Sequence, residues 1–400
     1  MTLRWLGNKT SLLEEIYTAA KKAGYQGGTV CDLFAGSGSV GRFFRSQGCR
    51  VISTDLMNCS HVFQKAYLET SEVPRFDGIK PLWETLDPVS ESRLSQLRET
   101  GEAWLPFRKL VNYLETVLPP EQGLLYRQFS KAGESERNYL TPENAARLDA
   151  ILACLRKWRV AGDLKPQEIW LLLASCIDAA DRVANISGTY GAYLKTVQGS
   201  ALRHLELKVP AIVDGPIGEG HRKDALDWIS EVECELLYID PPYNQRQYPA
   251  NYHLPEILSL LPFESSDDRI EDSIYGKTGL IPWKEKASPL CSRRGDDCFQ
   301  SVSQLIKSAK AEIIIFSYSE EGILQREELE SILQDWAGCD SEKGLSLLEI
   351  PYRRFRSDSG SNEAVKRTFR PAPGRSRDEV HEWLFVASKV VSSRDVKELQ

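Results

Sequence analysis

The sequence has no apolar run long enough to cross a membrane. Its longest apolar stretches, 169–177 and 313–316, fall far short of the roughly 18–20 residues that a membrane-spanning helix needs. The N-terminal residues MTLRWLGNKT have no hydrophobic run behind their basic side chains, so they do not resemble a secretory signal. We therefore expect a cytoplasmic protein without a membrane partner.

Cysteine and histidine are too scattered to form a disulfide framework or a zinc site. The nine cysteines contain no CxxC pair, and an odd number of them cannot all be paired, which indicates a reducing compartment. The five histidines show no spacing that would place them beside cysteines as metal ligands. We expect no structural or catalytic metal.

A strong charge of either sign is also missing. Among 400 residues, 57 acidic side chains stand against 50 basic ones, for a formal net charge of −7. This balance argues against a protein that coats nucleic acid nonspecifically, and it makes the distribution of charge more informative than its sum. The 42% of hydrophobic residues allow a sizeable core. The length suits one large α/β domain with an insertion, or two or three smaller domains.

Hydrophobic patterning near the N-terminus predicts a βαβ unit. Apolar residues recur at helical spacing over 12–22, and strand-like runs at 29–34 and 50–54 flank a glycine-rich turn and a predicted helix at 40–47. Strands joined by a helix favour a mostly parallel sheet, so we expect a Rossmann-like α/β fold. The same reasoning predicts helices at 167–185, 224–230, 301–308 and 326–334, strands at 236–239, 312–317 and 382–387, and an irregular loop over 265–300.

Residues 74–165 differ from the rest of the chain, because they are polar, helix-prone and rich in both basic and aromatic side chains. We interpret them as a mainly helical insertion that divides the α/β domain into 1–73 and 166–400. Arginines of this insertion could read guanine edges in the major groove of DNA. They could equally solvate an exposed helical face, and the sequence leaves both interpretations open.

A glycine-rich turn after the first strand indicates a nucleoside-containing cofactor. Gly36, Gly38 and Gly41 match the pattern GxGxxG, in which glycines allow a tight turn and close approach of the backbone to a ligand. Asp55 follows the next strand, where a carboxylate can accept hydrogen bonds from ribose hydroxyls. Asp32 favours S-adenosyl-L-methionine over a dinucleotide, because a carboxylate there would repel a pyrophosphate but suit a sulfonium-bearing amino acid.

A second motif, Asp240-Pro241-Pro242-Tyr243, follows the strand predicted at 236–239. Ligand crevices of α/β sheets open at the carboxyl ends of strands. Consecutive prolines remove two N–H donors and fix φ, which leaves their carbonyl groups as rigid acceptors. Asp240 adds an acceptor carboxylate and Tyr243 a stacking surface, so the motif suits the exocyclic amino group of a planar base.

These motifs resemble those of the N6-adenine DNA methyltransferases, and the N-terminal segment RWLGNK at 4–9 resembles the first motif of their Dam-like alpha group. The order also agrees, with the cofactor motif before the target-recognition region and the DPPY motif last. The resemblance covers roughly residues 1–60 and 185–400, and it implies a Rossmann-like fold and S-adenosyl-L-methionine as cofactor. The segment 74–165 itself resembles no known motif, and its place between the cofactor motif and the DPPY motif predicts that it is the target-recognition region. The resemblance further implies site-specific methylation of a flipped-out adenine in duplex DNA. The setting would be restriction–modification or phage defence, with a cognate restriction endonuclease as a candidate partner.

For catalysis, the resemblance implies Asp240, Pro241, Pro242 and Tyr243. Asp240 and the carbonyl of Pro241 would accept hydrogen bonds from the adenine amino group, while Tyr243 stacks on the base. The segment that follows, 244–253, is expected to border the pocket or the DNA. His253 within it could be taken for a general base, but a lone histidine is more often structural.

For the cofactor, the resemblance places Lys9 near its carboxylate, Asp55 at its ribose and Asp224 at its adenine. Ala225 stands where the family usually has an aromatic residue, which removes the expected stacking partner. Residues 186–193 also resemble, less specifically, a glycine-and-aromatic segment of the family. The cofactor-binding set implied in this way is Trp5, Lys9, Asp32, Phe34, Gly36, Gly38, Asp55, Asp224 and Asp240.

A basic segment at 352–377 precedes the last predicted strand and carries eight basic and two acidic side chains. It is a candidate for DNA phosphate contacts, or else a solvated surface loop. The residues predicted to bind nucleic acid are Arg353, Arg354, Arg356, Lys366 and Arg367.

Three other functions are compatible with parts of the sequence. An RNA base N-methyltransferase is one, since some of these enzymes carry a DPPY-type motif. An NAD-dependent dehydrogenase would explain the glycine-rich turn but not the DPPY motif. A non-catalytic DNA-binding module would explain the fold, although an intact DPPY motif argues against it.

Overall fold

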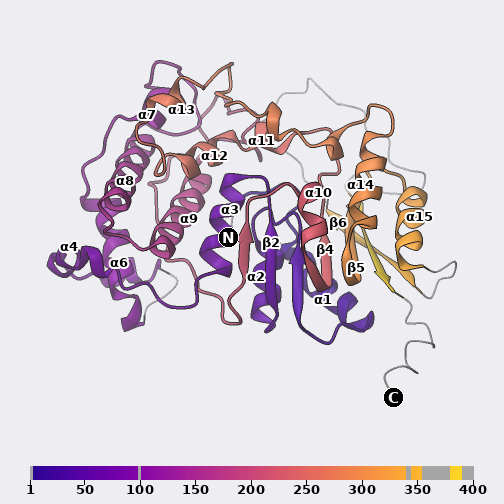
Figure 1. Ribbon diagram of the computed structural model, residues 1–400. Helices are drawn as coiled ribbons and strands as arrows, with labels where there is room; N and C mark the ends of the chain where they lie inside the picture. Colours follow the sequence, from indigo (N-terminus) through magenta and orange to yellow (C-terminus); the bar gives the residue numbers. More distant parts are fainter. Residues whose placement is uncertain (1–2, 98–100, 339–343, 354–378, 390–400) are drawn as a thin grey trace.

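The computed structural model describes residues 3–97, 101–338, 344–353 and 379–389. They form a seven-stranded sheet with the order β3-β2-β1-β4-β5-β7-β6 (Figure 1). Strands β1 to β5 run parallel, β7 runs antiparallel to β5, and β6 runs antiparallel to β7. This mostly parallel sheet confirms the predicted Rossmann-like α/β fold. The strands are β1 (Thr29–Asp32), β2 (Arg50–Thr54), β3 (Glu219–His221), β4 (Glu233–Ile239), β5 (Lys310–Ser319), β6 (Leu345–Arg353) and β7 (Glu379–Ser388).

Hydrophobic patterning does not predict either edge strand of the sheet, β3 or β6. β3 has only three residues, with Gly220 at its centre, so it offers no alternating apolar face. β6 contains Pro351, which an edge strand tolerates because one side of it makes no ladder hydrogen bonds. Since β6 extends through Tyr352 and Arg353, these two residues belong to the sheet, and the prediction of a loop beginning at residue 352 was wrong there. Arg354, Arg356, Lys366 and Arg367 lie outside the described residues.

Helices cover both faces of the sheet, because the central strands are apolar on both sides. α1 and α2 bury Ile16 and Phe44 against one face, beside Ile315 of β5. α14 and α15 bury Val302 and Leu329 against the other face, next to the short helix α10. The bounds of these helices are α1 (Leu13–Lys22), α2 (Ser39–Ser46), α10 (Ala225–Trp228), α14 (Asp297–Lys307) and α15 (Arg326–Ala337).

Two stretches differ from the sequence-based expectation. α14 begins at Asp297, ahead of the predicted start at residue 301. The stretch 265–300 is not uniformly irregular, since it contains α13 (Asp268–Glu271) and the 3₁₀ turns η6 (Lys284–Lys286) and η7 (Pro289–Cys291). Turns this short show no helical period in their apolar residues, so patterning does not reveal them.

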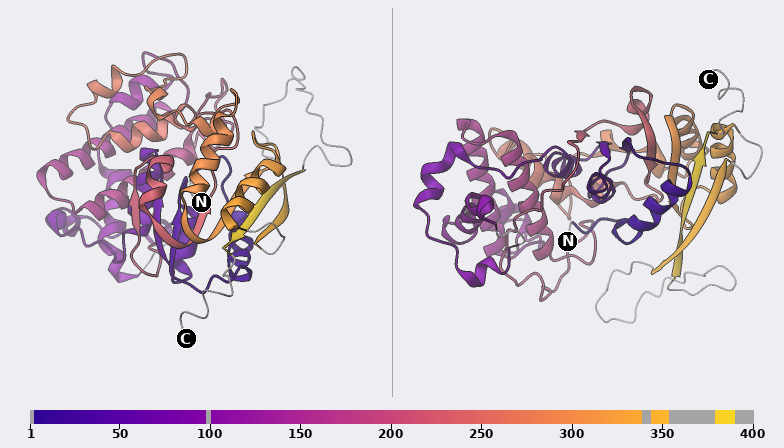
Figure 2. Two further views of the ribbon diagram at one scale, coloured as in Figure 1. Left: turned by 45° about the vertical axis from the view of Figure 1, so that its right-hand side comes forward. Right: turned by 90° about the horizontal axis from the view of Figure 1, so that it is seen from below.

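A second, helical core lies beside the β3 edge of the sheet. α3 contacts both β3 and α9, and Phe63 of α3 packs in one cluster with Leu148 of α8, Leu172 of α9 and Leu258 of α12. Figure 1 and the right-hand view of Figure 2 show these helices to one side of the sheet. The helices beside the sheet, with the short α11, are α3 (Asn58–Leu68), α4 (Lys80–Thr85), α5 (Glu91–Leu94), α6 (Leu105–Asn112), α7 (Leu124–Phe129), α8 (Pro142–Ala161), α9 (Pro166–Val183), α11 (Tyr248–Asn251) and α12 (His253–Leu260).

Arginines of the helical region bind the segment that follows α12. Arg127 Nε donates to Glu271 Oε1 over 3.0 Å. Arg156 Nη2 donates to the carbonyl of Leu261 over 2.7 Å and also pairs with Asp267. These guanidinium groups therefore tie helices of 74–165 to residues 261–271, which favours a structural role for them over contact with guanine edges.

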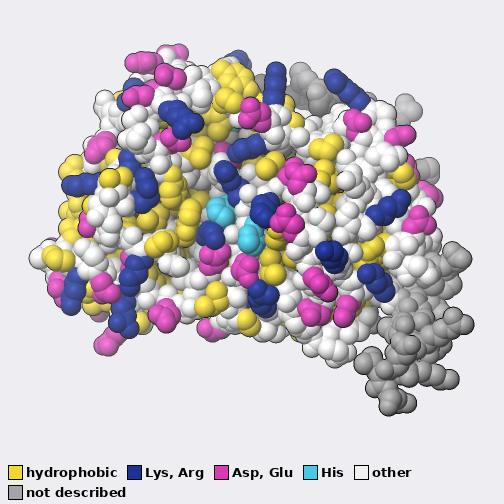
Figure 3. Space-filling view, in the orientation of Figure 1, with side chains coloured by type: hydrophobic (Ala, Val, Ile, Leu, Met, Phe, Trp, Pro, Cys, Tyr) yellow, Lys and Arg dark blue, Asp and Glu magenta, His cyan; other side chains and the backbone are white. Residues whose placement is uncertain are grey.

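One face of the molecule carries mixed charge. On the face shown in Figure 3, Lys and Arg side chains are interspersed with Asp and Glu over both the sheet and the helical region. Within the described residues, no helix combines the length and the apolar character that a bilayer crossing requires. The same residues contain no group of three or more His, Cys, Asp and Glu side chains that could hold a metal ion.

The strand order reverses between β1 and β4, which opens a crevice at the carboxyl ends of these strands. Asp32 is the last residue of β1, and Asp240 directly follows β4. Because β7 is antiparallel, its first half lies at this same edge, where Glu382 pairs with Ser319 at the end of β5. The fold thus brings three segments that are far apart in the sequence to one edge of the sheet.

Candidate active site

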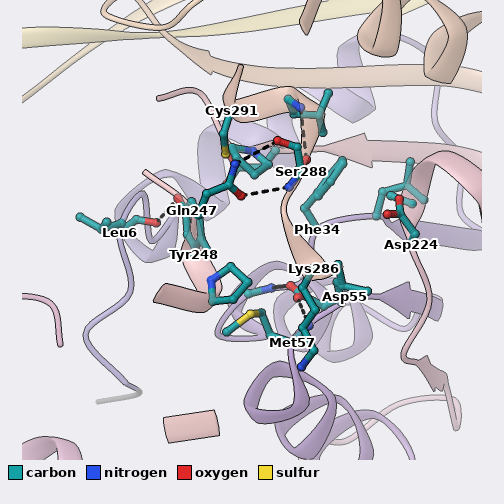
Figure 4. Close-up of a pocket in the computed structure, with 18 of the residues that line it drawn as sticks. Leu6, Phe34, Asp55, Met57, Asp224, Gln247, Tyr248, Lys286, Ser288 and Cys291 are labelled. Atoms are coloured by element: carbon teal, nitrogen blue, oxygen red, sulfur yellow. Dashed lines mark hydrogen bonds between the residues drawn. The ribbon is translucent and has the colours of Figure 1, made fainter. Parts of the chain in front are cut away.

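Two adjoining pockets open at the carboxyl ends of β1 and β4, and Figure 4 shows the larger one. They share Trp5, Phe34, Gly36 and Asp240, so the two spaces meet beside the end of β4. The larger pocket extends toward the end of β2 and the start of α10, and the smaller one toward the N-terminal segment. The residues assigned to a cofactor from the sequence that line one or both pockets are Trp5, Lys9, Asp32, Phe34, Gly36, Asp55, Asp224 and Asp240.

Side chains of the protein contact the glycine-rich turn from two sides. Gly36 and Gly38 have φ angles of +51° and +72°, a region that residues with a side chain rarely adopt. A Cβ atom on Gly36 would lie 2.6 Å from the indole nitrogen of Trp5. On the other side, the N–H of Gly36 donates to Asp55 Oδ2 over 2.8 Å. Gly38 lines neither pocket and instead precedes the first turn of α2.

Asp55 and Asp224 line the larger pocket from two neighbouring segments (Figure 4). Besides the bond from Gly36, Asp55 accepts a hydrogen bond from the N–H of Met57 over 2.8 Å. Burial outweighs these hydrogen bonds and raises the pKa of Asp55 to about 6. Asp224 caps the N-terminus of α10, where its carboxylate accepts the N–H of Leu226 over 2.9 Å.

Asp32 lines the smaller pocket with an unsatisfied carboxylate. It is 1% exposed, and neither of its carboxylate oxygens has a hydrogen-bond partner among the described residues. Burial raises its pKa to about 8, with further contributions from the negative charges of Asp240 and Asp55, and the nearby backbone N–H groups of Gly41 and Phe34 only partly oppose this rise. A buried acceptor without a donor is costly, so this site fits a ligand that brings a cationic donor.

Lys9 binds two carboxylates of the protein. Its Nζ lies 3.0 Å from Asp240 Oδ1 and 3.0 Å from Glu382 Oε1, and its side chain is only 4% exposed. Burial alone would lower the pKa of Lys9, but Asp240 and Glu382 hold it well above the usual value. Contact of Lys9 with a cofactor carboxylate stays a prediction. Glu382 was not among the predicted site residues, although a charged side chain between Val380 and Leu384 on one face of a strand is a signal for it.

Of Lys9, Asp240 and Glu382, only Asp240 lines both pockets. Burial raises its pKa to about 7, Lys9 opposes this effect, and Glu382 adds to it. The residues after it keep the motif rigid: Pro241 is buried, Pro242 lines the larger pocket, and the carbonyl of Tyr243 accepts the N–H of Ile323 over 3.0 Å.

An aromatic group connects the N-terminal segment to the residues after the DPPY motif. The ring of Trp5 stacks on Tyr252 and lies 5.6 Å from Tyr248, measured between centroids. The hydroxyl of Tyr248 donates to the carbonyl of Leu6 over 3.3 Å, and the hydroxyl of Tyr252 accepts the N–H of Leu6 over 2.7 Å. Gln247 and Tyr248 line the larger pocket, so part of the segment 244–253 borders it, as expected.

The segment 284–291 also lines the larger pocket, and sequence reasoning did not assign it a role. Gln247 and Ser288 form a reciprocal pair, in which Ser288 N donates to Gln247 Oε1 over 2.9 Å and Gln247 Nε2 donates to Ser288 O over 3.2 Å (Figure 4). Lys286 pairs over 2.9 Å with Glu256, whose carboxylate also accepts the N–H of Cys59 at the start of α3. No local motif indicates these contacts, because the partners are distant in sequence.

His253 lies outside both pockets. It is buried in the helical core, with its ring 6.1 Å from that of Phe129 and 5.6 Å from that of Tyr139. Burial lowers its pKa to about 4, so the ring stays neutral at physiological pH. This position supports the structural interpretation of His253 over a catalytic one.

Comparison with known proteins gives consistent matches. The model of the D12 class N6 adenine-specific DNA methyltransferase family matches residues 5–332, which include the glycine-rich turn, Asp224 and the DPPY motif. The type II methyltransferase M.FokI from Planomicrobium okeanokoites is 31% identical over 394 residues, which make up 98% of this chain and 53% of M.FokI. The type II methyltransferase M.NlaIII from Neisseria lactamica is 32% identical over 340 residues, 84% of this chain and 86% of M.NlaIII.

A viral relative, the type II methyltransferase M.CviAII from Paramecium bursaria Chlorella virus 1, is 28% identical over 345 residues. The chain spans about half the length of M.FokI and most of the length of M.NlaIII. The family match covers well over half of the chain and the segments that build both pockets. On this evidence, the chain belongs to the D12 class N6 adenine-specific DNA methyltransferase family.

Proposed function

We propose that this protein transfers a methyl group from S-adenosyl-L-methionine to the N6 amino group of an adenine in duplex DNA, at a specific sequence. The observation that carries the proposal is the position of Asp240 where the two pockets meet. Carboxylates suited to a cationic nucleoside line both pockets, Asp55 and Asp224 in the larger and Asp32 in the smaller, and the adjoining DPPY motif would offer acceptors and a ring to a base. Family membership supports the same reaction.

The residues present fit this cofactor. Asp55 at the end of β2 would accept the ribose hydroxyls, and Asp224 at the start of α10 would contact the adenine. The unsatisfied carboxylate of Asp32 would receive the cationic amino-acid part, which removes the cost of a buried acceptor without a donor. When bound, S-adenosyl-L-methionine supplies an electrophilic methyl group.

The protein contributes mainly positioning and electrostatics. An adenine flipped out of the duplex, at a cost of a few kcal/mol of unstacking, would stack on Tyr243. Asp240 and the carbonyl of Pro241 would accept hydrogen bonds from its amino group, which directs the nitrogen lone pair toward the methyl donor. Asp240 need not remove a proton beforehand, because the amino group becomes acidic only once it is methylated.

The proposal also covers how the protein contacts its DNA target and the biological system in which it acts. We propose that the helical region 74–165 contributes to target recognition and that the basic segment 352–377 contacts DNA phosphates. M.FokI and M.NlaIII are described as type II methyltransferases, which supports a restriction–modification setting with a cognate restriction endonuclease as a candidate partner.

Methyl transfer from labelled S-adenosyl-L-methionine to duplex DNA, compared with RNA, tests the proposal. We expect transfer to DNA adenine in the wild-type protein and none in Asp240→Ala. Asp227→Ala, an exposed site on α10, serves as the matched control and should retain transfer. Transfer to RNA alone would favour an RNA base methyltransferase and contradict the proposal. Expression in a methylation-free host, with modified adenines mapped across the genome, would then give the recognition sequence.

A further inference from the structure

A single buried ammonium group lies between two carboxylates at the edge of the candidate site. Lys9 Nζ is 3.0 Å from an oxygen of Asp240 and 3.0 Å from an oxygen of Glu382. Of the two carboxylates, only Asp240 lines the pockets, with a side chain that is 18% exposed, whereas the side chain of Glu382 is 3% exposed and lines neither pocket. Any effect of Glu382 on the reaction therefore passes through Lys9 and Asp240 and not through contact with a substrate.

The register of β7 in the sheet fixes the position of Glu382. It lies on the same face of β7 as Leu384 and Val386, which pack in the core under α1 and α2. A carboxylate at a buried strand position is costly unless it is paired and hydrogen-bonded. Here the hydroxyl of Ser317 on β5 donates to the same Glu382 oxygen that contacts Lys9, so the carboxylate is held from two sides.

The charge of this group is the unusual feature. A pair of Lys9 with Asp240 would already be neutral, and the carbonyl of Gly7 accepts a further hydrogen bond from the ammonium group over 3.0 Å. When Asp240 and Glu382 are both ionised, the group of three carries a net charge of −1, at an added cost of burial that a purely structural pair would avoid. Sharing the ammonium group between two carboxylates leaves Asp240 less neutralised than it would be in an exclusive pair.

We propose that Glu382 is a positioning residue for methyl transfer, which holds Lys9 beside Asp240 and shares its positive charge so that the Asp240 carboxylate remains a strong acceptor. The inference rests on the proposed function of Asp240. An acceptor that is only partly neutralised attracts the adenine amino group more strongly, and it stabilises the positive charge that develops on the nitrogen as the methyl group is transferred.

Removal of the Glu382 charge should change the titration of Asp240 in a defined direction. Without Glu382, one repulsion on Asp240 disappears and Lys9 pairs with Asp240 alone, and both effects lower the pKa of Asp240. The other titratable groups that face Asp240 stay in place in such a variant. These groups are Lys9 from the N-terminal segment, Asp32 from β1, Tyr238 from β4 and Tyr248 from α11.

The decisive experiment is the pH profile of kcat in Glu382→Gln, measured at saturating cofactor and duplex DNA. Glutamine keeps the size of the side chain and can still accept from Ser317, but it lacks the charge. We expect the acid limb of the profile to move to lower pH by about one unit, with kcat on the plateau reduced about tenfold and both KM values within about twofold of wild type. A purely structural role would lower activity without moving the acid limb.

Further variants separate the effect of the Glu382 charge from the effect of its packing. Glu312→Gln, at an exposed position of β5, is the matched control and should follow wild type. Ser317→Ala keeps both carboxylates, so its acid limb should stay in place. In a Lys9→Met background, Glu382→Gln should have little further effect on the plateau kcat, because Glu382 acts on the ionised Asp240 mainly by sharing the Lys9 charge. If Glu382→Gln does not fold, Glu382→Asp retains the charge and should keep the wild-type acid limb.

The outcomes distinguish this inference from the proposed function. If wild type methylates duplex DNA and the profile of Glu382→Gln superimposes on it, the positioning role is wrong while the function stands. Additive effects of Lys9→Met and Glu382→Gln would also overturn the positioning role. If wild type transfers no methyl group to DNA, the proposed function itself fails.

Discussion

The indole ring of Trp5 stacks on the phenol ring of Tyr252, with ring centroids 4.3 Å apart and ring planes inclined by 18°. This contact joins the N-terminal segment to the start of α12, although the two residues are 247 positions apart in the sequence. Trp5 also packs against the turn at Gly36, so one side chain links three parts of the candidate site.

Trp5→Ala should weaken both the fold and cofactor binding. The change removes the stack on Tyr252 and one wall shared by both pockets. We expect the free energy of unfolding to fall by about 2–4 kcal/mol and cofactor affinity to fall at least about tenfold. Denaturant titration and calorimetric binding check these values. Trp5→Phe, which keeps an aromatic ring, should recover most of the stability, and equal losses in both variants would contradict the stacking role.

Gly36→Ala should lose cofactor binding, and Gly48→Ala should not. Both glycines have positive φ, so each substitution carries a backbone cost of about 1–2 kcal/mol. Only at residue 36 would the new Cβ meet another group, the indole of Trp5 at 2.6 Å, whereas at residue 48 it would meet nothing within 4 Å. Thermal unfolding should therefore detect both changes, and a binding titration only the first. Retained binding in Gly36→Ala would show that the turn does not have to approach the ligand closely.

Binding of S-adenosyl-L-methionine should release protons near neutral pH. The pKa of Asp32 is about 8 in the free protein, so its carboxyl group is mostly protonated at pH 7. A cationic ligand favours the ionised form and lowers this pKa, so a proton leaves as the ligand binds. Calorimetry in buffers of different ionisation enthalpy should show release of up to about one proton per bound cofactor. Asp32→Asn should lose most of this release, and an unchanged release would assign it to another carboxyl group.

Lys286→Met should loosen the segment 284–291 over the larger pocket. Glu256 would lose its ammonium partner but keep the N–H of Cys59, so the helix start it holds should survive. We expect the KM for the cofactor to rise about threefold to tenfold, with a smaller change in kcat. Lys284→Met, at an exposed position of the same turn, is the matched control and should leave the cofactor KM unchanged. Equal effects of the two substitutions would argue against a specific role for the Lys286 contact.

Several elements of the site could be predicted from short stretches of sequence. A local apolar pattern lies next to a distinctive chemical motif at two places. One is β1, which ends at Asp32 and leads into the glycine-rich turn, and the other is β4, which directly precedes Asp240. Edge strands β3 and β6 could not be predicted, because one is too short to show a period and the other includes Pro351. The turns at 284–291 were missed for a similar reason, since their contacts with Gln247 and Glu256 join residues far apart in the chain.

The sequence by itself determined the αβ arrangement around the two motifs, because periodicity and turn chemistry act over a few neighbouring residues. Only the tertiary structure decided which charged groups meet at Asp240. Lys9 and Glu382 lie near opposite ends of the chain, and their contact depends on the antiparallel pairing of β7 with β5, which turns the beginning of β7 toward the carboxyl ends of β1 and β4. Strand direction and register are collective properties of the sheet, so no local pattern could have shown that Lys9 and Glu382 form a buried ion pair.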